Sequence, residues 1–278
     1  MNIKRKVSSI LGGLGIAVAV PAVAFAASTT IVTPSNTQGW TTADTRPGGS
    51  VQIISDNTAP GDPHNGALQL TTDVTTTAKA QYMHESSTAL GDVTELGYQT
   101  KQNSAPFPGA TASYQVAVDL NGDATGGFTT LVYEPYQNGT VTPGVWQEWD
   151  VDAGQFWSSR SFTDGTCTVV AGGGGAPFYT LEGLQAACPD AVVQGFGVNI
   201  GSNNPSYNVE ADLVNFNGTT YNFEPFQTPN DKDQCKKDGW KNLADSQGNS
   251  FKNQGQCVSS VVSNKPSTVS QILGFFGL

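Results

Sequence analysis

The chain has 278 residues, 37% of them hydrophobic, and a formal net charge of −10 at pH 7. Residues 27–231 hold 20 acidic and 4 basic residues, whereas residues 232–278 hold six lysines and three aspartates. An acidic body repels phosphate backbones, so we expect no nucleic-acid partner. The length allows one good-sized core and one small additional unit.

The N-terminus has the order of a secretory signal peptide over residues 1–26. Three basic residues at positions 4–6 precede an almost wholly apolar run over 10–23, and Ala24-Phe25-Ala26 supplies small residues for cleavage. The run is too short for a stable transmembrane helix of about 20 residues. We therefore predict a secreted protein, extracellular or associated with the cell wall, with an uncleaved N-terminal anchor as the alternative.

Residues 27–226 are predicted to form an all-β domain. Short runs of β-branched and aromatic residues alternate with polar ones and are punctuated by Gly, Thr, Asn and Pro, which is typical of an antiparallel sandwich or barrel. Nine or ten strands are expected, enough for two packed sheets. Their positions are 51–54, 67–71, 79–84, 95–101, 112–120, 128–134, 145–151, 192–200, 213–216 and 219–223.

Two local signals are specific. Asn217-Gly218 lies between two alternating runs, which predicts a tight β-hairpin. A short helix is predicted over 180–187, because Thr180 can cap its N-terminus and Pro189 stops it.

Four cysteines follow the signal, and an even number in an exported chain favours disulfides. We expect the local pairs Cys167–Cys188 and Cys235–Cys257, each closing a loop of about 22 residues, which the chain-entropy model values at about 3 kcal/mol. A four-cysteine zinc site is the less favoured alternative, because the chain has no Cys-x-x-Cys spacing.

The composition changes after the domain. We interpret residues 227–232 as a linker, residues 233–262 as a cysteine-pair module, and residues 263–278 as an apolar C-terminal tail that either docks on the body or stays free. The module has few large apolar residues, so it needs its disulfide in order to fold. Its lysines would attract anionic wall polymers at low salt.

The segments 233–240 (DQCKKDGW) and 251–257 (FKNQGQC) resemble a cysteine-pair module found at the C-termini of many uncharacterised secreted bacterial proteins. The body is similar to the sandwich domains that precede that module. In outline it also resembles the jelly rolls of concanavalin A-type lectins and carbohydrate-binding modules. The resemblance implies a jelly-roll or concanavalin A-like architecture for the sandwich, to which the residue patterns above add one short helix and a small disulfide-stapled C-terminal module.

Glu148, Asp150 and Asp152 would share one face of a strand. The row resembles the Glu-x-Asp-x-Glu strand of laminarinase-type jelly-roll hydrolases. That likeness implies Glu148 as nucleophile and Asp150 as supporting carboxylate, with Asp152 in place of the family's acid/base glutamate. Retaining glycosidases need two carboxyls about 5–5.5 Å apart, so the shorter arm of Asp152 disfavours catalysis. A cation site or a solvated strand face are the alternatives.

Asp119, Asn121 and Asp123 begin like a calcium loop. An EF-hand requires Gly at its sixth position and Glu at its twelfth, where this chain has Ala124 and Thr130. A calcium loop of another type stays open, beside the simpler interpretation as a turn between two strands. We expect no other cofactor.

The remaining binding candidates are aromatic. Tyr133, Tyr136, Trp146, Trp149 and Trp157 lie within 25 residues, and exposed rings of this kind stack on sugar faces. A sandwich of this size also buries several aromatic rings, and Trp149 is the one most expected in the core. Trp157 is predicted to be exposed on a loop, and we take it with Tyr136, Tyr133 and Trp146 as ligand-binding candidates.

No common nucleophile system is apparent. His64 and His84 are the only histidines, and Gly-x-Ser-x-Gly is absent. The favoured function is a secreted, non-catalytic module that binds glycan or cell-envelope material. The alternatives are a glycoside hydrolase of jelly-roll type that uses Glu148, and a structural extracellular surface protein.

Overall fold

The computed structural model describes residues 28–61, 66–122, 126–226, 228–245 and 249–263. The expected signal peptide, His64, Asp123 and almost all of the C-terminal tail lie outside the described residues. Within the described part, no helix combines the length and the apolar character needed to cross a membrane.

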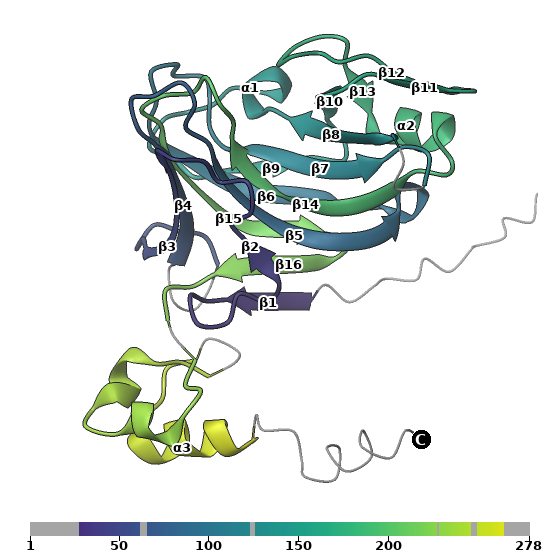
Figure 1. Ribbon diagram of the computed structural model, residues 1–278. Helices are drawn as coiled ribbons and strands as arrows, with labels where there is room; N and C mark the ends of the chain where they lie inside the picture. Colours follow the sequence, from purple (N-terminus) through teal and green to yellow (C-terminus); the bar gives the residue numbers. More distant parts are fainter. Residues whose placement is uncertain (1–27, 62–65, 123–125, 227, 246–248, 264–278) are drawn as a thin grey trace, which may run out of the picture.

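The body is a β-sandwich of two seven-stranded sheets (Figure 1). The first sheet contains β1 (Ser28–Val32), β3 (Gly49–Ser55), β4 (Gly66–Thr72), β6 (Leu96–Ser104), β9 (Gln147–Asp150), β15 (Asn208–Phe216) and β16 (Thr219–Phe223). The second sheet has the order β13 (Tyr179–Thr180), β10 (Gln155–Ser158), β8 (Phe128–Tyr133), β7 (Ser113–Asp119), β14 (Val192–Ile200), β5 (Ala80–Ala89) and β2 (Trp40–Thr41). This confirms the predicted fold class.

The pairing is antiparallel except at one edge. Strand β1 runs parallel to β16, from the pair Ser28–Thr219 to the pair Val32–Phe223. The predicted Asn217-Gly218 hairpin connects β15 and β16, and both turn residues have positive φ, 50° and 77°. A small ribbon of β11 (Phe162–Asp164) and β12 (Cys167–Val169) projects from the second sheet (Figure 1).

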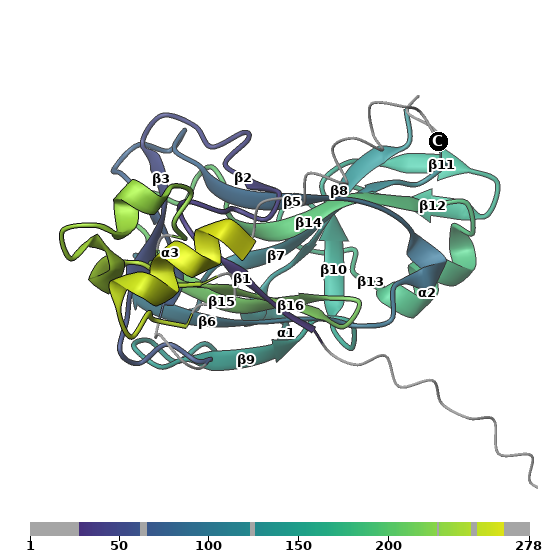
Figure 2. The same ribbon diagram turned by 90° about the horizontal axis from the view of Figure 1, so that it is seen from below.

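The core lies between the two sheets, which are seen nearly edge-on in Figure 2. Tyr114, Val116 and Val118 of β7 point inward, as their alternation predicts. Trp40 is the centre of an aromatic group: its ring lies 5.3 Å from that of Tyr82 and 5.1 Å from that of Phe223. Because these partners come from both sheets, Trp40 joins the two layers at this end of the sandwich.

The predicted helix is α2 (Leu181–Ala187), and the Thr180 hydroxyl accepts a hydrogen bond from the Gly183 N–H at 3.1 Å. Its C-terminal neighbour Cys188 forms a disulfide with Cys167 of β12, the expected pairing. The structure adds a one-turn helix α1 (Pro135–Asn138) and a 3-10 turn η1 (Leu90–Asp92), which the sequence analysis missed.

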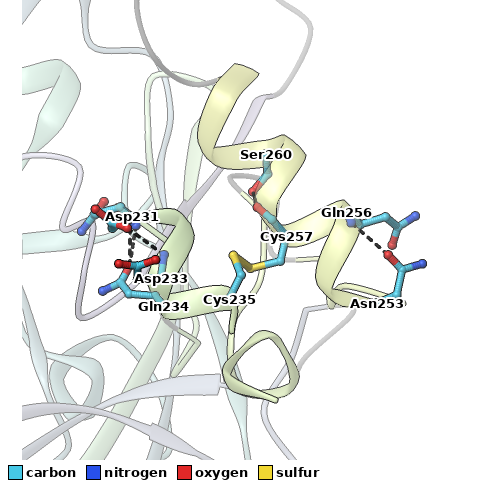
Figure 3. Close-up of a disulfide and its surroundings, with 9 residues drawn as sticks. Asp231, Asp233, Gln234, Cys235, Asn253, Gln256, Cys257 and Ser260 are labelled. Carbon is cyan, nitrogen blue, oxygen red and sulfur yellow. Dashed lines mark hydrogen bonds between the residues drawn. A yellow bond between two sulfur atoms is a disulfide. The ribbon is translucent and has the colours of Figure 1, made fainter. Parts of the chain in front are cut away.

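The C-terminal module lies apart from the sandwich core (Figure 1). It contains two 3-10 turns, η2 (Lys232–Cys235) and η3 (Gly239–Asn242), and the helix α3 (Gln254–Ser263). The second expected disulfide joins Cys235 of η2 to Cys257 of α3 (Figure 3). Asp231 and Gln234 form a reciprocal capping box at η2. The module's own buried cluster is small, with Leu243, Phe251 and Val261 around the disulfide.

Candidate functional site

An open cleft of about 900 Å³ lies on the outer face of the second sheet; we call it the outer-sheet cleft. It exists because the strands there alternate between core and surface. On β7, Tyr114 and Val116 face the core, so Ser113, Gln115 and Ala117 face the cleft. The same alternation on β8, β14 and β5 continues this face across the sheet.

Strand register aligns one row of side chains across the cleft. Trp157 of β10 pairs with Val132 of β8, which pairs with Gln115 of β7. Gln115 pairs in turn with Gly197 of β14, and Gly197 pairs with Met83 of β5. A Cβ atom on Gly197 would lie 2.2 Å from the Tyr82 carbonyl oxygen and 2.8 Å from the Met83 sulfur. A side chain at this position of the row would therefore clash with β5.

The floor is polar and internally hydrogen-bonded. The Gln115 amide donates to the Ser113 hydroxyl at 2.8 Å, and the Ser113 hydroxyl donates to the Asn199 carbonyl at 3.1 Å. The Asn199 amide donates to Gln81 Oε1 at 2.9 Å. These contacts hold amide and hydroxyl groups in fixed positions, as sites that recognise polar ligands require.

Exposed aromatic rings line the rim. Phe107 and Tyr136 meet edge to face with ring centroids 5.4 Å apart, and 51% and 37% of their surfaces are exposed. The Tyr136 hydroxyl donates to the Gly174 carbonyl at 3.4 Å. Phe128 lies at another part of the rim, with the Arg160 guanidinium 5.2 Å from its ring. Apolar ring surface thus stands beside polar groups of the floor, a combination suited to a ligand with both characters.

Charged residues occupy one part of the cleft wall. Asp44 forms ion pairs with Lys79 and with Arg46, the latter at 3.6 Å, and the hydrogen bond from Lys79 is the main cause that lowers the Asp44 pKa. The Arg46 guanidinium also donates to the Ser202 hydroxyl at 3.0 Å. Asp44 is therefore already paired with two cationic side chains of the same wall.

Glu134 is the other carboxyl group among the described residues that line the cleft. It follows β8 directly and is the N-cap of α1, where Pro135 takes the first helical position. Burial raises the pKa of Glu134 to about 7. The Trp157 indole N–H lies near enough to oppose that rise, without the geometry of a full hydrogen bond. Among the described lining residues, Glu134 is thus a carboxyl whose pKa is near 7, and the other carboxyl, Asp44, is held in ion pairs.

The structure separates the four aromatic binding candidates. Trp157 and Tyr136 line the outer-sheet cleft, although Trp157 lies half-buried on strand β10, so the expected loop position is wrong. Tyr133 faces the core and is 2% exposed. Trp146 lies on the other side of the sandwich, where its indole donates to Asp56 at 3.2 Å and its ring faces the Lys101 ammonium at 5.5 Å. Trp149 is a core residue, as predicted.

The carboxylate row lies on the opposite face. Glu148, Asp150 and Asp152 line a smaller cavity of about 450 Å³ on the first sheet, together with Glu95. Glu148 and Asp150 are exposed, and Asp152 accepts a hydrogen bond from the Leu96 N–H at 2.7 Å. In the described residues, no three His, Cys, Asp or Glu side chains converge as a metal site. Because the carboxylate row lies on the first sheet, it is remote from the aromatic residues at the rim of the outer-sheet cleft.

The expected calcium loop is described only in part. Asp119 ends β7 and is buried, and its carboxylate accepts a hydrogen bond from the Gln194 amide at 3.3 Å. The other carboxylate oxygen of Asp119 accepts a hydrogen bond from the Asn121 N–H at 3.4 Å. Asp123 lies outside the described residues, so this site stays a prediction.

Sequence reasoning missed most of the cleft floor and half of its rim. Gln115, Asn199, Phe107 and Phe128 carried no motif. The available signal was the strand over 112–120, whose outward side chains had to face something once Tyr114 and Val116 were assigned to the core.

No protein-family model matches the sequence, and a search of curated proteins gave no match. The chain is similar in fold to the family 11 carbohydrate-binding module of the Clostridium thermocellum cellulosomal cellulase Lic26A-Cel5E, with a TM-score of 0.38, 12% identity, and coverage of 64% of this chain and 86% of that chain. A second structure of a family 11 module from that organism is in complex with a β-1,3-1,4-mixed-linked tetrasaccharide. It matches with a TM-score of 0.38 and 12% identity, and the match covers 68% of this chain and 91% of that chain. The CBM22-1 xylan-binding domain of Paenibacillus barcinonensis Xyn10C matches with a TM-score of 0.31 and 18% identity, and the match covers 64% of this chain and 84% of that chain. We draw no functional conclusion from scores of this size.

Proposed function

We propose that this protein is an exported, non-catalytic module that binds a glycan chain in the outer-sheet cleft. The single observation that supports the proposal most is the cleft itself: a hollow of about 900 Å³ with fixed amide and hydroxyl groups on its floor and exposed rings on its rim. Sugars present hydroxyl groups at their edges and C–H groups on their ring faces. The polar floor can bind the hydroxyl groups, and the rings of the rim can stack on the C–H faces.

Binding fits the cleft better than hydrolysis does. A retaining or inverting glycosidase needs two carboxyl groups across the scissile bond. Of the two carboxyl groups that the structure describes in the cleft, Asp44 is held by Lys79 and Arg46. Glu134 is left without a partner carboxylate. Glu148 and its neighbours lie on the other sheet, so they cannot act on a chain held by the rim aromatics.

Export is supported by the N-terminal signal pattern and by the two disulfides, because such bonds form and persist in oxidising compartments. Cell-wall polysaccharide is then the most accessible ligand class. The lysines of the C-terminal module would add weak, salt-sensitive attraction to anionic wall polymers.

The test is co-sedimentation of the purified protein with insoluble polysaccharides and cell walls, with an assay for released sugar in the supernatants. Selective retention without released sugar is the expected result. Release of sugar that Glu148→Gln abolishes would replace binding by hydrolysis. Neither retention nor release on any polymer would favour the structural alternative. A second series at high salt separates the cleft, which should retain its ligand, from the lysines, whose contribution should vanish.

A further inference from the structure

Three polar side chains are buried together in the first sheet, and none of them lines either cavity. Asp212 lies on β15, Asn222 lies on β16, and Glu224 follows β16 directly. Their exposed fractions are 0%, 1% and 0%. Asp212 lies beside the end of β16, because its carboxylate is hydrogen-bonded to the N–H of Phe223, the residue between Asn222 and Glu224.

Most polar atoms of this group lack a hydrogen bond of good geometry. Asp212 Oδ1 accepts the Phe223 N–H at 2.9 Å. Asp212 Oδ2, both Glu224 carboxylate oxygens and both amide atoms of Asn222 have no such partner. The Asn222 amide and the Gly66 N–H approach Glu224, and the Leu213 N–H approaches Asp212, but without that geometry. Buried polar atoms in folded proteins are almost always satisfied, so a group of five such atoms indicates a ligand between them.

No cationic side chain in the described part of the chain pairs with Asp212 or Glu224. The same sheet shows how the protein neutralises another buried carboxylate: Glu210, also on β15, is paired with the Lys101 ammonium at 3.0 Å. Two buried carboxylates without a counter-charge carry a large desolvation cost. A cation bound between them would offset that cost.

The backbone is arranged to bring these groups together. Pairing of β15 with β6 changes register between Asp212 and Asn215, and Leu213 has a positive φ of 47°. Bulges of this kind redirect a side chain at the edge of regular pairing. Gly66 packs so closely that a Cβ atom there would lie 2.6 Å from the Glu224 Cα, and a Cβ on Gly61 would lie 3.0 Å from the Asn222 amide nitrogen. Glycine at both positions lets the backbone at Gly61 and at Gly66 lie against the group.

We infer that Asp212, Asn222 and Glu224 supply the side-chain ligands of a buried site for a divalent cation of calcium's type. The donor set is all oxygen, two carboxylates and an amide, which suits a hard cation and not zinc or copper. Two carboxylates balance the charge of one divalent ion. Backbone carbonyls and water would complete the six to eight oxygens that calcium takes.

The site differs from the loop at Asp119, which the sequence alone favoured, and it ties β15 to the end of β16.

The test is a thermal melt of the purified, disulfide-bonded protein at pH 7.5, after treatment with a chelator and its removal. Calcium chloride at about 100 times its dissociation constant should raise Tm by roughly 5 °C or more, and magnesium chloride by less. In Asp212→Asn/Glu224→Gln the calcium shift should disappear. Because the variant removes uncompensated buried charge, its Tm in chelator should equal or exceed that of the wild type.

The matched control is Glu148→Gln/Asp150→Asn, which removes the same charge from exposed positions and should keep the full calcium shift. Asp119→Asn should keep it too. An absent calcium shift in the wild type, or a shift that survives in Asp212→Asn/Glu224→Gln, would overturn the inference. If the double variant does not fold, equilibrium dialysis of calcium against the wild type and Glu224→Gln decides: equal affinity in both contradicts the site.

Discussion

Glu134 illustrates how a single side chain takes its properties from its place in the fold. β8 ends at Tyr133 and α1 begins at Pro135, and Glu134 between them lines the outer-sheet cleft together with Trp157. Partial removal from water raises its pKa to about 7, against a smaller opposing effect of the Trp157 indole. The carboxyl therefore changes charge near neutral pH.

This pKa predicts a pH-dependent stability. Well below pH 4.5 Glu134 is protonated in both the folded and the unfolded protein, so it contributes no difference. As pH rises toward 7, the unfolded state ionises first and folding loses up to about 3 kcal/mol, a loss complete above the folded-state pKa. The Tm of Glu134→Gln minus that of the wild type should increase between pH 5 and pH 8 in thermal melts. An equal difference at both pH values would show that the carboxyl is not perturbed.

Individual side chains were predictable where their neighbours along the chain decided their place. Trp149 reads as a core residue, because alternation places it opposite the exposed Glu148 and Asp150. Trp40 could not be recognised, since its ring partners Tyr221 and Phe223 lie about 180 residues away in the sequence. The outward position of Trp157 was expected, but its strand was not.

At the scale of secondary structure, α2 is the element most fully determined by local sequence. Thr180 supplies the N-cap, Leu181 and Leu184 form the buried face, and the Cys167–Cys188 disulfide ties its C-terminal end to β12. The cap satisfies one of the N–H groups that a helix leaves free at its start.

Removing that cap should have a measurable cost. Thr180→Ala deletes the hydroxyl that accepts the Gly183 N–H, and we expect a loss of about 1 kcal/mol in the free energy of unfolding. Chemical denaturation measures it. Thr168→Ala, an exposed threonine on β12 with no capping role, serves as the comparison and should change stability by less than about 0.5 kcal/mol. Equal effects of the two substitutions would mean that the cap contributes nothing specific.

Strands with a clear local alternation were predicted, and strands without one were missed. Strands of five or more residues with clear alternation, such as β4 and β7, were predicted close to their observed bounds. The missed strands are β1, β2, β10, β11, β12 and β13. For β2 and β10 the extended shape depends on pairing partners outside the local sequence: Trp40 pairs with His84, and Phe156 pairs with Tyr133 and Tyr179. Because β10 carries Trp157, this omission also hid one wall of the cleft.

On the scale of the whole molecule, the protein has two separate cores of very different size. The sandwich has a large cluster that joins both sheets, whereas the C-terminal module relies on five buried residues, two of which are the disulfide cysteines. A cluster that small cannot offset the loss of chain entropy on folding without its cross-link.

Cys235→Ser/Cys257→Ser should therefore unfold the module and leave the sandwich intact. Limited proteolysis followed by mass spectrometry should show rapid cleavage within residues 228–263 and protection of the sandwich. The main thermal transition should stay within about 2 °C of the wild-type value. Protection of residues 228–263 in this variant would show that packing alone holds the module. A large fall in the main transition would show that the module supports the sandwich.

The two proposed sites occupy different places in the sandwich. The outer-sheet cleft crosses the second sheet, and the group formed by Asp212, Asn222 and Glu224 lies buried in the first. A stabilising cation in one sheet and a ligand surface on the other are therefore testable independently. Sequence analysis reached the sandwich and the idea of a glycan ligand, while the cleft floor depends on strand register that no local pattern shows.

The most direct measurement is the dissociation constant for a polysaccharide retained by the wild-type protein, compared with Phe107→Ala, Tyr136→Ala and Phe178→Ala. Phe178 is 39% exposed, which matches the rim aromatics, but it lies outside the cleft. Loss of either rim ring should weaken binding roughly two- to tenfold, while Phe178→Ala leaves it unchanged. Wild-type affinity in both rim variants, or equal weakening in all three, would contradict the outer-sheet cleft as the binding site.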